Sequence, residues 1–317
     1  MIRLILIGIG AGVATALLVA SIISGATISI FLFYLAPLPI MIAALGWSHW
    51  AGLIAAIVAA SALAAVLTPL FFVTFLAGVG LPAWWLAYLS LLGRPTPGAP
   101  GQMEWYPVGR VVIWAAILGA GVVIVSIPNF GMDEDSFRAG LRKTFDLMLQ
   151  AQTRGDRPFS LPGVSQADLE KILTFMVAIF PMVGAVLATF ISLLNLWLAA
   201  RIVNVSGQLK RPWPSLPDMR FPPFVPALFA VSIAGTFLPG LAGTIASILA
   251  ASLSLAYIVL GLAVLHAITR NVSARPLLLG ASYAAIVALQ GLPLLLVAML
   301  GLADTIFAFR GQTPRTE

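Results

Sequence analysis

Residues 34–53 read YLAPLPIMIAALGWSHWAGL, and the apolar character of this stretch continues to Leu92. Between Tyr34 and Leu92 the only side chain that titrates near neutral pH is His49. A soluble domain needs solvated faces, and about a quarter of its residues are normally charged. The stretch therefore predicts closely connected helices that cross a membrane, because a membrane helix needs about 20 mainly apolar residues.

The composition of the whole chain supports the same fold class. The chain has 317 residues, of which 61% are hydrophobic and 9% are charged. Its apolar runs predict about eight or nine membrane helices of the usual length. The runs are long and continuous, whereas a membrane barrel would show short segments of alternating polarity. We predict an all-α, polytopic transmembrane helix bundle with one external amphipathic helix.

The long polar segment divides the chain into three parts within one integral membrane domain. Residues 1–128 form an N-terminal block of five membrane helices, residues 129–170 an extracytoplasmic amphipathic segment, and residues 171–310 a C-terminal membrane block. Acidic residues near Asp133 and Ser136 are typical of a helix start. Apolar residues then recur at helical spacing along one face, and Ser165 with Asp168 predicts the capped start of the next helix.

Several classes of function are excluded by what the sequence lacks. Cysteine is absent, so disulfides, thiolate nucleophiles and cysteine-based metal sites are excluded. Neither a phosphate-binding loop nor a dinucleotide-binding fingerprint is present, so we expect no ATPase activity, no cofactor and no enzymatic function. His49 and His266 have no further ligands at helical spacing, which argues against a metal site.

The net charge of +6 belongs to short loops between apolar runs. It indicates topology and attraction to membrane lipids, not nucleic acid. The loop from Arg201 to Arg220 is the most basic, so we place it and the N-terminus in the cytoplasm of a bacterium, with the chain in the plasma (inner) membrane. The C-terminal topology stays open, since the last apolar run either crosses once or folds back near Pro293.

The first predicted helix carries a stripe of small residues, and the second contains two prolines. Small residues recur every fourth position along the first helix, which favours close contact with another helix, either in this chain or in another subunit. These residues are Gly8, Gly12, Ala16 and Ala20. In the second helix Pro37 and Pro39 each remove a backbone donor, so the helix should kink or unwind there. Unwound backbone in a membrane survives only beside protein or a water-lined cavity, which makes this region a candidate site.

A few polar residues interrupt the apolar runs. Asp304 is either a functional intramembrane acid or a helix-end acid that pairs with Arg310 or a lipid head group. Asn195 and Gln290 either bond across helices or line a polar path. His49 lies between Trp47 and Trp50, which is typical of the aromatic belt at a membrane interface.

Two stretches resemble known families. The small-residue stripe of the first helix, followed by LAPLPIMIAALGWSHWAGLIAA at residues 35–56, resembles the substrate-binding S-components of energy-coupling-factor transporters. YIVLGLAVL from Tyr257 and GLADTIFAFR from Gly301 to Arg310 are similar to the uncharacterised YybS-like bacterial membrane proteins. This resemblance implies a small hydrophobic or vitamin-like ligand, and a membrane coupling subunit docked on the stripe. The extra helices and the external segment depart from the six-helix pattern of S-components.

The leading hypothesis is a small-molecule transporter or an S-component-like substrate-binding protein. Its candidate ligand-binding residues lie on and after the kinked helix, and they are Tyr34, Pro37, Pro39, Trp47 and His49. The alternative is a membrane scaffold or assembly protein that recruits partners through the Pro-rich cytoplasmic loop at residues 201–223. A third hypothesis is a lipid-handling protein or membrane enzyme that uses Asp304.

Overall fold

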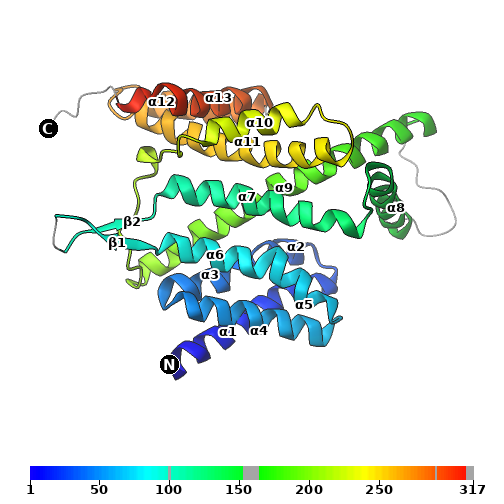
Figure 1. Ribbon diagram of the computed structural model, residues 1–317, viewed down its shortest axis with the longest axis horizontal. Helices are drawn as coiled ribbons and strands as arrows, with labels where there is room; N and C mark the ends of the chain where they lie inside the picture. The colour runs from blue at the N-terminus through cyan, green and yellow to red at the C-terminus, as the bar shows by residue number, and fades with distance from the viewer. Residues whose placement is uncertain (99–100, 153–163, 290, 312–317) are drawn as a thin grey trace.

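The computed structural model describes residues 1–98, 101–152, 164–289 and 291–311, which form an all-α bundle whose helices run roughly along one long axis (Figure 1). The helices of the first part are α1 (Ile2–Ala20), α2 (Thr27–Tyr34), α3 (Pro37–Gly46), α4 (His49–Val66), α5 (Leu70–Phe75), α6 (Leu81–Ser90) and α7 (Val108–Ser126). Those of the second part are α8 (Glu134–Gln152), α9 (Gln166–Val205), α10 (Val225–Gly235), α11 (Gly240–Ile268), α12 (Arg275–Leu289) and α13 (Gly291–Phe307).

Short elements connect these helices. Strands β1 (Gly93–Pro95) and β2 (Met103–Trp105) form an antiparallel hairpin in which Arg94 faces Glu104. A π-helical turn, η2 (Leu76–Gly80), joins α5 to α6. The remaining elements are single 3-10 turns, namely η1 (Ser21–Ser24), η3 (Ile127–Asn129), η4 (Leu216–Asp218) and η5 (Phe309–Gly311).

Seven helical spans within the described residues are long and apolar enough to cross a membrane. They are residues 2–24, 27–46, 49–66, 70–90, 108–129, 166–205 and 240–268. The apolar helices α10, α12 and α13 are shorter. Helices α12 and α13 lie side by side and contact each other, so the last apolar run folds back on itself (Figure 1). The all-α polytopic fold predicted from the sequence is thereby confirmed.

The two ends of the bundle differ. The N-terminus, the β1–β2 hairpin, the segment between α9 and α10 and the end of α13 share one end, whereas α8 lies at the opposite end (Figure 1). We call the first the basic end and the second the α8 end. Helix α9 runs between them through the middle of the bundle and contacts α3, α7 and α11. It therefore joins the N-terminal and C-terminal membrane blocks.

Small residues allow the closest helix contacts. A Cβ atom at Gly8 would lie 2.9 Å from the carbonyl oxygen of Ala51, and one at Gly12 would lie 2.7 Å from that of Ala55. The stripe on α1 thus faces α4 of the same chain, with Ala16 and Ala20 half-buried beside it. A second close contact joins α11 to α13, where a Cβ atom at Gly261 would lie 1.8 Å from the Val297 carbonyl oxygen. Such contacts bring helix backbones together where van der Waals packing drives association.

The kink predicted in the second membrane span is a break between α2 and α3. Pro37 begins α3, and the Leu38 N–H bonds to the Leu35 carbonyl instead of the Tyr34 carbonyl one residue earlier. The Tyr34 carbonyl instead accepts a hydrogen bond of 2.8 Å from Nδ2 of Asn195 on α9. Asn195 is fully buried and also bonds to the Ile191 carbonyl of its own helix. The side chain therefore bonds across helices at the break.

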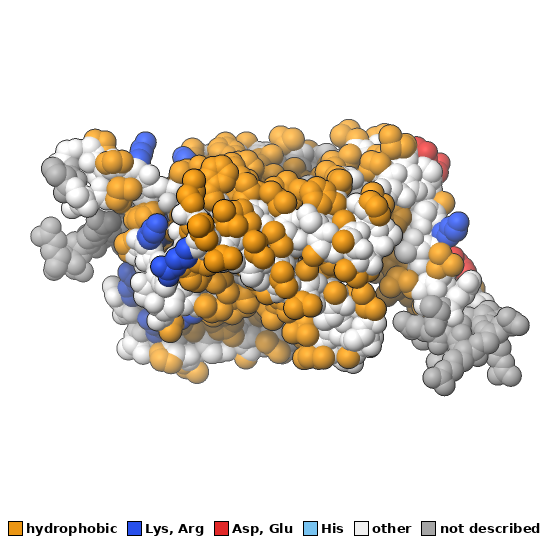
Figure 2. Space-filling view, turned by 90° about the horizontal axis from the view of Figure 1, so that it is seen from below, with side chains coloured by type: hydrophobic (Ala, Val, Ile, Leu, Met, Phe, Trp, Pro, Cys, Tyr) orange, Lys and Arg blue, Asp and Glu red, His pale blue; other side chains and the backbone are white. Residues whose placement is uncertain are grey.

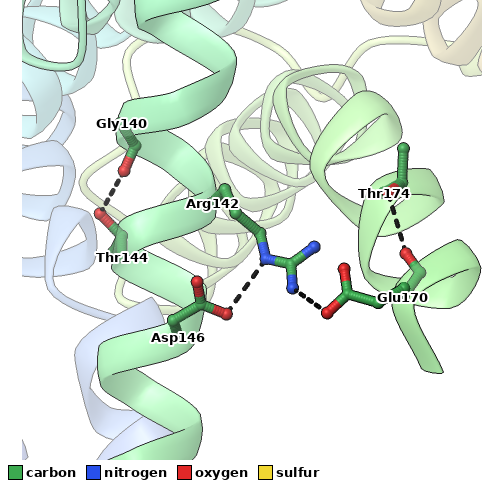
Figure 3. A network of polar contacts seen from close by, with 6 residues as sticks. All are labelled: Gly140, Arg142, Thr144, Asp146, Glu170 and Thr174. Carbon is green, nitrogen blue, oxygen red and sulfur yellow. Dashed lines mark hydrogen bonds and ion pairs between the residues drawn. The ribbon is translucent and has the colours of Figure 1, made fainter. Parts of the chain in front are cut away.

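Helix α8 is the amphipathic helix expected from the polar segment. Its apolar residues Phe137 and Leu141 are buried against the bundle. Figure 3 shows Arg142 between two carboxylates, with Nε donating to Asp146 at 3.1 Å and Nη2 donating to Glu170 of α9 at 2.9 Å. Ser165 accepts a bond from the Asp168 N–H, which confirms the predicted cap of α9.

The start of α8 depends on Asp133. Its carboxylate accepts hydrogen bonds from the Ser136 N–H at 2.9 Å and from the Ser136 hydroxyl at 2.6 Å. The bond from the Ser136 hydroxyl, followed by the one from its N–H, lowers the pKa of the Asp133 carboxyl. A carboxyl whose pKa is lowered by folding stabilises the structure above its unfolded pKa. That contribution is lost as the pH falls through the folded pKa.

We expect Asn195→Leu to destabilise the protein by about 1 kcal/mol, because the buried Tyr34 carbonyl loses its partner. Thermal unfolding in detergent measures the effect. The matched control is Thr174→Val, which removes an exposed α9 hydroxyl that bonds to the Glu170 carbonyl of the same helix. Equal unfolding temperatures for the two variants would contradict this account.

We expect Asp133→Asn to keep the protection of the α8 amides at neutral pH, since asparagine also caps helices well. In acid the native protein should lose that protection as Asp133 is protonated, while the variant should not lose this part of it. Hydrogen exchange of residues 134–150, compared between the two proteins at each pH, measures the difference. Asp133→Ala serves as the control and should lose protection at every pH. Identical acid profiles for the native protein and Asp133→Asn would rule out Asp133 as the titrating cap.

Candidate functional site

A cavity of about 610 Å³ lies at the basic end between α7, α9 and α11, and we call it the lateral cavity. Residues of the segment 209–219 close it on the side of the basic end. Its helical lining is mostly apolar, and it includes Val108, Val111, Val112, Leu193, Trp197, Ala200, Val259 and Ala263. A cavity of this size and character is typical of small-molecule sites.

The cavity opens along one side of α9. Phe190 and Trp197 line it, yet they are 51% and 47% exposed on the outside of the bundle. Tyr283 of α12 also lines the cavity and is exposed. Because α9 spans the membrane, this opening faces the region that lipid chains occupy.

Arg211 is the principal cation of the lining. Its Nη1 donates a 3.0 Å hydrogen bond to the Ser90 carbonyl at the end of α6, whereas its Nε is buried without a hydrogen-bond partner among the described residues. Burial lowers the pKa of the Arg211 guanidinium. An arginine remains protonated in proteins, so a positive charge is held at the cavity. Nearby, Arg201 lies over the ring of Trp213 at 5.5 Å, and Trp213 lines the cavity.

His266 is a second polar residue of the lining. Its Nδ1 lies 2.9 Å from the Leu262 carbonyl oxygen, and a carbonyl only accepts, so Nδ1 carries a proton. Nε2 is then the acceptor of a neutral ring and a second donor of a charged one. The sequence analysis assigned no binding role to His266, because its neighbours in the cavity come from α7, α9 and the segment 209–219, which are distant in the sequence.

An ion pair holds the segment 206–224 on the bundle. Asp304 is 6% exposed, and its Oδ2 accepts from Arg310 Nη2 at 2.6 Å and from Nε at 3.0 Å. Arg310 also donates to the carbonyl of Pro217 at 2.5 Å and to that of Met219 at 2.6 Å. Asp304 therefore orients the arginine that holds this segment, which is the helix-end pairing considered from the sequence.

Further contacts fix the same segment. Met219 and Phe221 are buried, and a Cβ atom at Gly109 would lie 1.9 Å from the Arg220 carbonyl oxygen. The second half of the Pro-rich loop is thus packed against α7 and α11 and is not extended away from the bundle. Its first half carries Arg211 and Trp213 to the lateral cavity.

The candidate ligand-binding residues on and after the kinked helix do not meet at one site. Tyr34 and Pro37 line a smaller cavity of about 130 Å³ with Gly78, Pro82 and other residues. Pro39 lines neither this cavity nor the lateral one. The structure therefore supports a shared position for Tyr34 and Pro37 alone.

Trp47 and His49 lie at the other end of α3, about 15 Å along a helix of this length. There the His49 ring is 5.2 Å from that of Tyr88, and the His49 carbonyl accepts a bond from Trp84. This arrangement is an aromatic cluster of α4 and α6. Of the other polar candidates, Asn195 bonds at the α2–α3 break, and Gln290 lies outside the described residues. Within the described ranges, no group of three His, Cys, Asp or Glu side chains is placed to hold a metal ion.

Charges are separated along the bundle. Figure 2 shows an apolar middle, basic side chains towards one end, and acidic together with basic side chains at the other. The basic end carries Arg3, Arg94, Arg110, Arg201, Lys210, Arg211, Arg220, Arg270, Arg275 and Arg310. The described acids of the α8 end are Asp133, Glu134, Asp135, Asp146, Asp168 and Glu170. The lateral cavity therefore lies at the end where basic residues outnumber acidic ones, and three of these basic residues pair with Glu104, Asp218 and Asp304.

Comparison with curated proteins and with solved structures finds no match. Residues 13–305 match a protein family described as "Predicted membrane protein (DUF2232)". The match covers most of the 317-residue chain, including every element that builds the lateral cavity. Together with the apolar helical spans, it makes the chain a multi-pass membrane protein and a member of the DUF2232 family of predicted membrane proteins.

Proposed function

We propose that this protein binds a small apolar or amphiphilic molecule in the lateral cavity and serves as a transporter or as the substrate-binding component of one. The observation that carries the proposal is the cavity of about 610 Å³ between three membrane helices, with an opening along the exposed side of α9. Binding requires no ATPase or enzymatic activity of the chain itself.

The route of entry supports a ligand that comes from the membrane. Phe190, Leu194 and Trp197 line the cavity and are exposed on α9. A molecule dissolved in the hydrocarbon region would reach the cavity without passing a polar barrier. The cavity between α2, α3 and η2 is smaller, at about 130 Å³, which is below the usual range for small-molecule pockets. A site at Tyr34 and Pro37 is therefore the weaker candidate.

We propose that the basic end faces the cytoplasm of a bacterium, with the chain in the plasma membrane. The support is the concentration of Lys and Arg at that end, because cytoplasmic loops carry an excess of these residues. The N-terminus would then be cytoplasmic and α8 would lie outside.

An S-component-like or YybS-like role fits this proposal with one restriction. Gly8 and Gly12 already pack on α4, so a coupling subunit would have to dock elsewhere, for example on the exposed face of α1 that carries Ile5, Leu6 and Val13. The scaffold alternative is less well supported, because Met219 and Phe221 of the Pro-rich loop are buried against the bundle. An enzymatic role for Asp304 is disfavoured by its ion pair with Arg310.

We expect the double variant Ala200→Leu, Ala263→Leu to bind an apolar naphthalene fluorophore at least about tenfold more weakly than the native protein. Both alanines line the lateral cavity, and a ligand forced against added methyl groups loses about 1.4 kcal/mol or more. Fluorescence titration in detergent measures the affinity.

The matched control is Ala65→Leu, which adds the same atoms at an exposed position of α4 and should bind as the native protein does. Native affinity in the double variant would exclude the lateral cavity as the ligand site.

A further inference from the structure

We propose that the lateral cavity selects a lipid with a phosphate-bearing head group, with the hydrocarbon chain along α9 and α11 and the phosphate at Arg211. This inference rests on the proposed function, because it names the ligand class of the same cavity. It adds the charge of the ligand, its orientation and the residue that recognises it.

The ionisable side chains of the cavity lining are basic. Arg211 and His266 line the cavity, and no Asp or Glu is among the described residues of the lining. The described acids at the basic end have other partners: Glu104 pairs with Arg94 at 2.8 Å, Asp218 with Arg270 at 4.0 Å, and Asp304 with Arg310 at 2.6 Å. Within the described residues Arg211 forms no ion pair with a carboxylate. We therefore expect the ligand of this cavity to carry an anionic group that pairs with Arg211.

The geometry of Arg211 fits a phosphate. One of its nitrogens, Nη1, bonds to the Ser90 carbonyl, and this bond fixes the guanidinium at the end of α6. The buried Nε has no partner among the described residues, so a donor remains on the guanidinium edge. Arginine presents its donors in a planar fork, which binds phosphate oxygens in pairs. A buried donor without a partner is costly, and a bound phosphate would relieve that cost.

Two further groups lie in or beside the same cavity. Arg201 lies over the Trp213 ring, which holds its charge beside the cavity. His266 has Nδ1 committed to the Leu262 carbonyl, which leaves Nε2 as its second hydrogen-bonding atom. Arg201, Arg211 and the His266 ring therefore come from the end of α9, the segment that follows it and the end of α11.

The depth of the cavity favours a lipid over a soluble anion. Its lining on α9 extends from Phe190 to Ala200. Ten residues of helix rise about 15 Å, which is roughly half of a hydrocarbon core of about 30 Å. The cavity thus spans one leaflet, with its cations at the basic end and its opening on the lipid side. A soluble phosphate would use the cations and leave the apolar length empty.

The test compares phosphatidylglycerol with diacylglycerol carrying identical chains, because diacylglycerol has no phosphate. The full-length protein in neutral detergent is titrated with each lipid, and bound lipid is counted by native mass spectrometry. We expect the native protein to bind the first phosphatidylglycerol at least about tenfold more tightly, since a charge-assisted bidentate contact exceeds the contribution of a neutral one. Arg211→Gln should remove most of this preference.

The matched control is Arg94→Gln, which removes one positive charge from the same end, at an exposed hairpin away from the cavity. It should keep the native preference. If Arg211→Gln does not fold, Arg201→Gln is the second test variant. We expect it to reduce the preference for phosphatidylglycerol about threefold, because it removes the cation over the Trp213 ring.

Each other outcome has a distinct meaning. Equal binding of the two lipids by the native protein, or an equal loss in Arg94→Gln and Arg211→Gln, would overturn the phosphate inference while the apolar site stands. Unchanged binding of both lipids and of the fluorophore in Ala200→Leu, Ala263→Leu would instead overturn the proposed function, because the lipid would then lie outside the cavity.

Discussion

The bundle depends on one constraint, which is that backbone groups inside a membrane need hydrogen-bond partners from the protein. The hydrogen bond from Asn195 to the Tyr34 carbonyl satisfies this constraint at the break between α2 and α3. In hydrocarbon, water does not satisfy backbone groups, so every break in a membrane helix needs a partner from the protein. Pro37 ends the regular bonding of α2, and Asn195 supplies the missing donor from a helix 161 residues away in the sequence. This bond attaches α3 to α9, and α9 in turn contacts α7 and α11.

The middle of α9 is held by similar small polar contacts. The Thr189 and Ser252 hydroxyls lie 2.6 Å apart, and Ser252 donates to the Ala116 carbonyl at 2.8 Å. These groups join α9, α11 and α7 where small residues such as Gly119 permit a close approach. Towards the basic end the lining residues are larger, and the same three helices leave the lateral cavity between them. The cavity is thus bounded by helices whose positions are fixed deeper in the bundle.

The segment between α9 and α10 closes the cavity at the basic end. Hydrogen bonds hold both halves of this segment on the bundle. Arg310 binds the carbonyls of Pro217 and Met219 while its charge is balanced by Asp304. Arg211 is tied to Ser90. The buried acid therefore helps to position a loop, whereas Arg211 has no carboxylate partner among the described residues. The structure therefore distinguishes the ion pair that positions the loop from the arginine that lines the cavity, which the sequence alone does not do.

The sequence by itself determined the membrane class, the helical fold, the amphipathic segment and the capped start of α9. These properties depend on composition and on local chemistry, such as the missing N–H of Pro37 and the capping side chain of Ser165. It also indicated that Asn195 and Asp304 would need partners. Only the tertiary structure decided which partners they have, and that Trp47 and His49 lie apart from Tyr34. The lateral cavity joins residues from Leu45 to Tyr283, and such an arrangement depends on how helices pack, which no local pattern encodes.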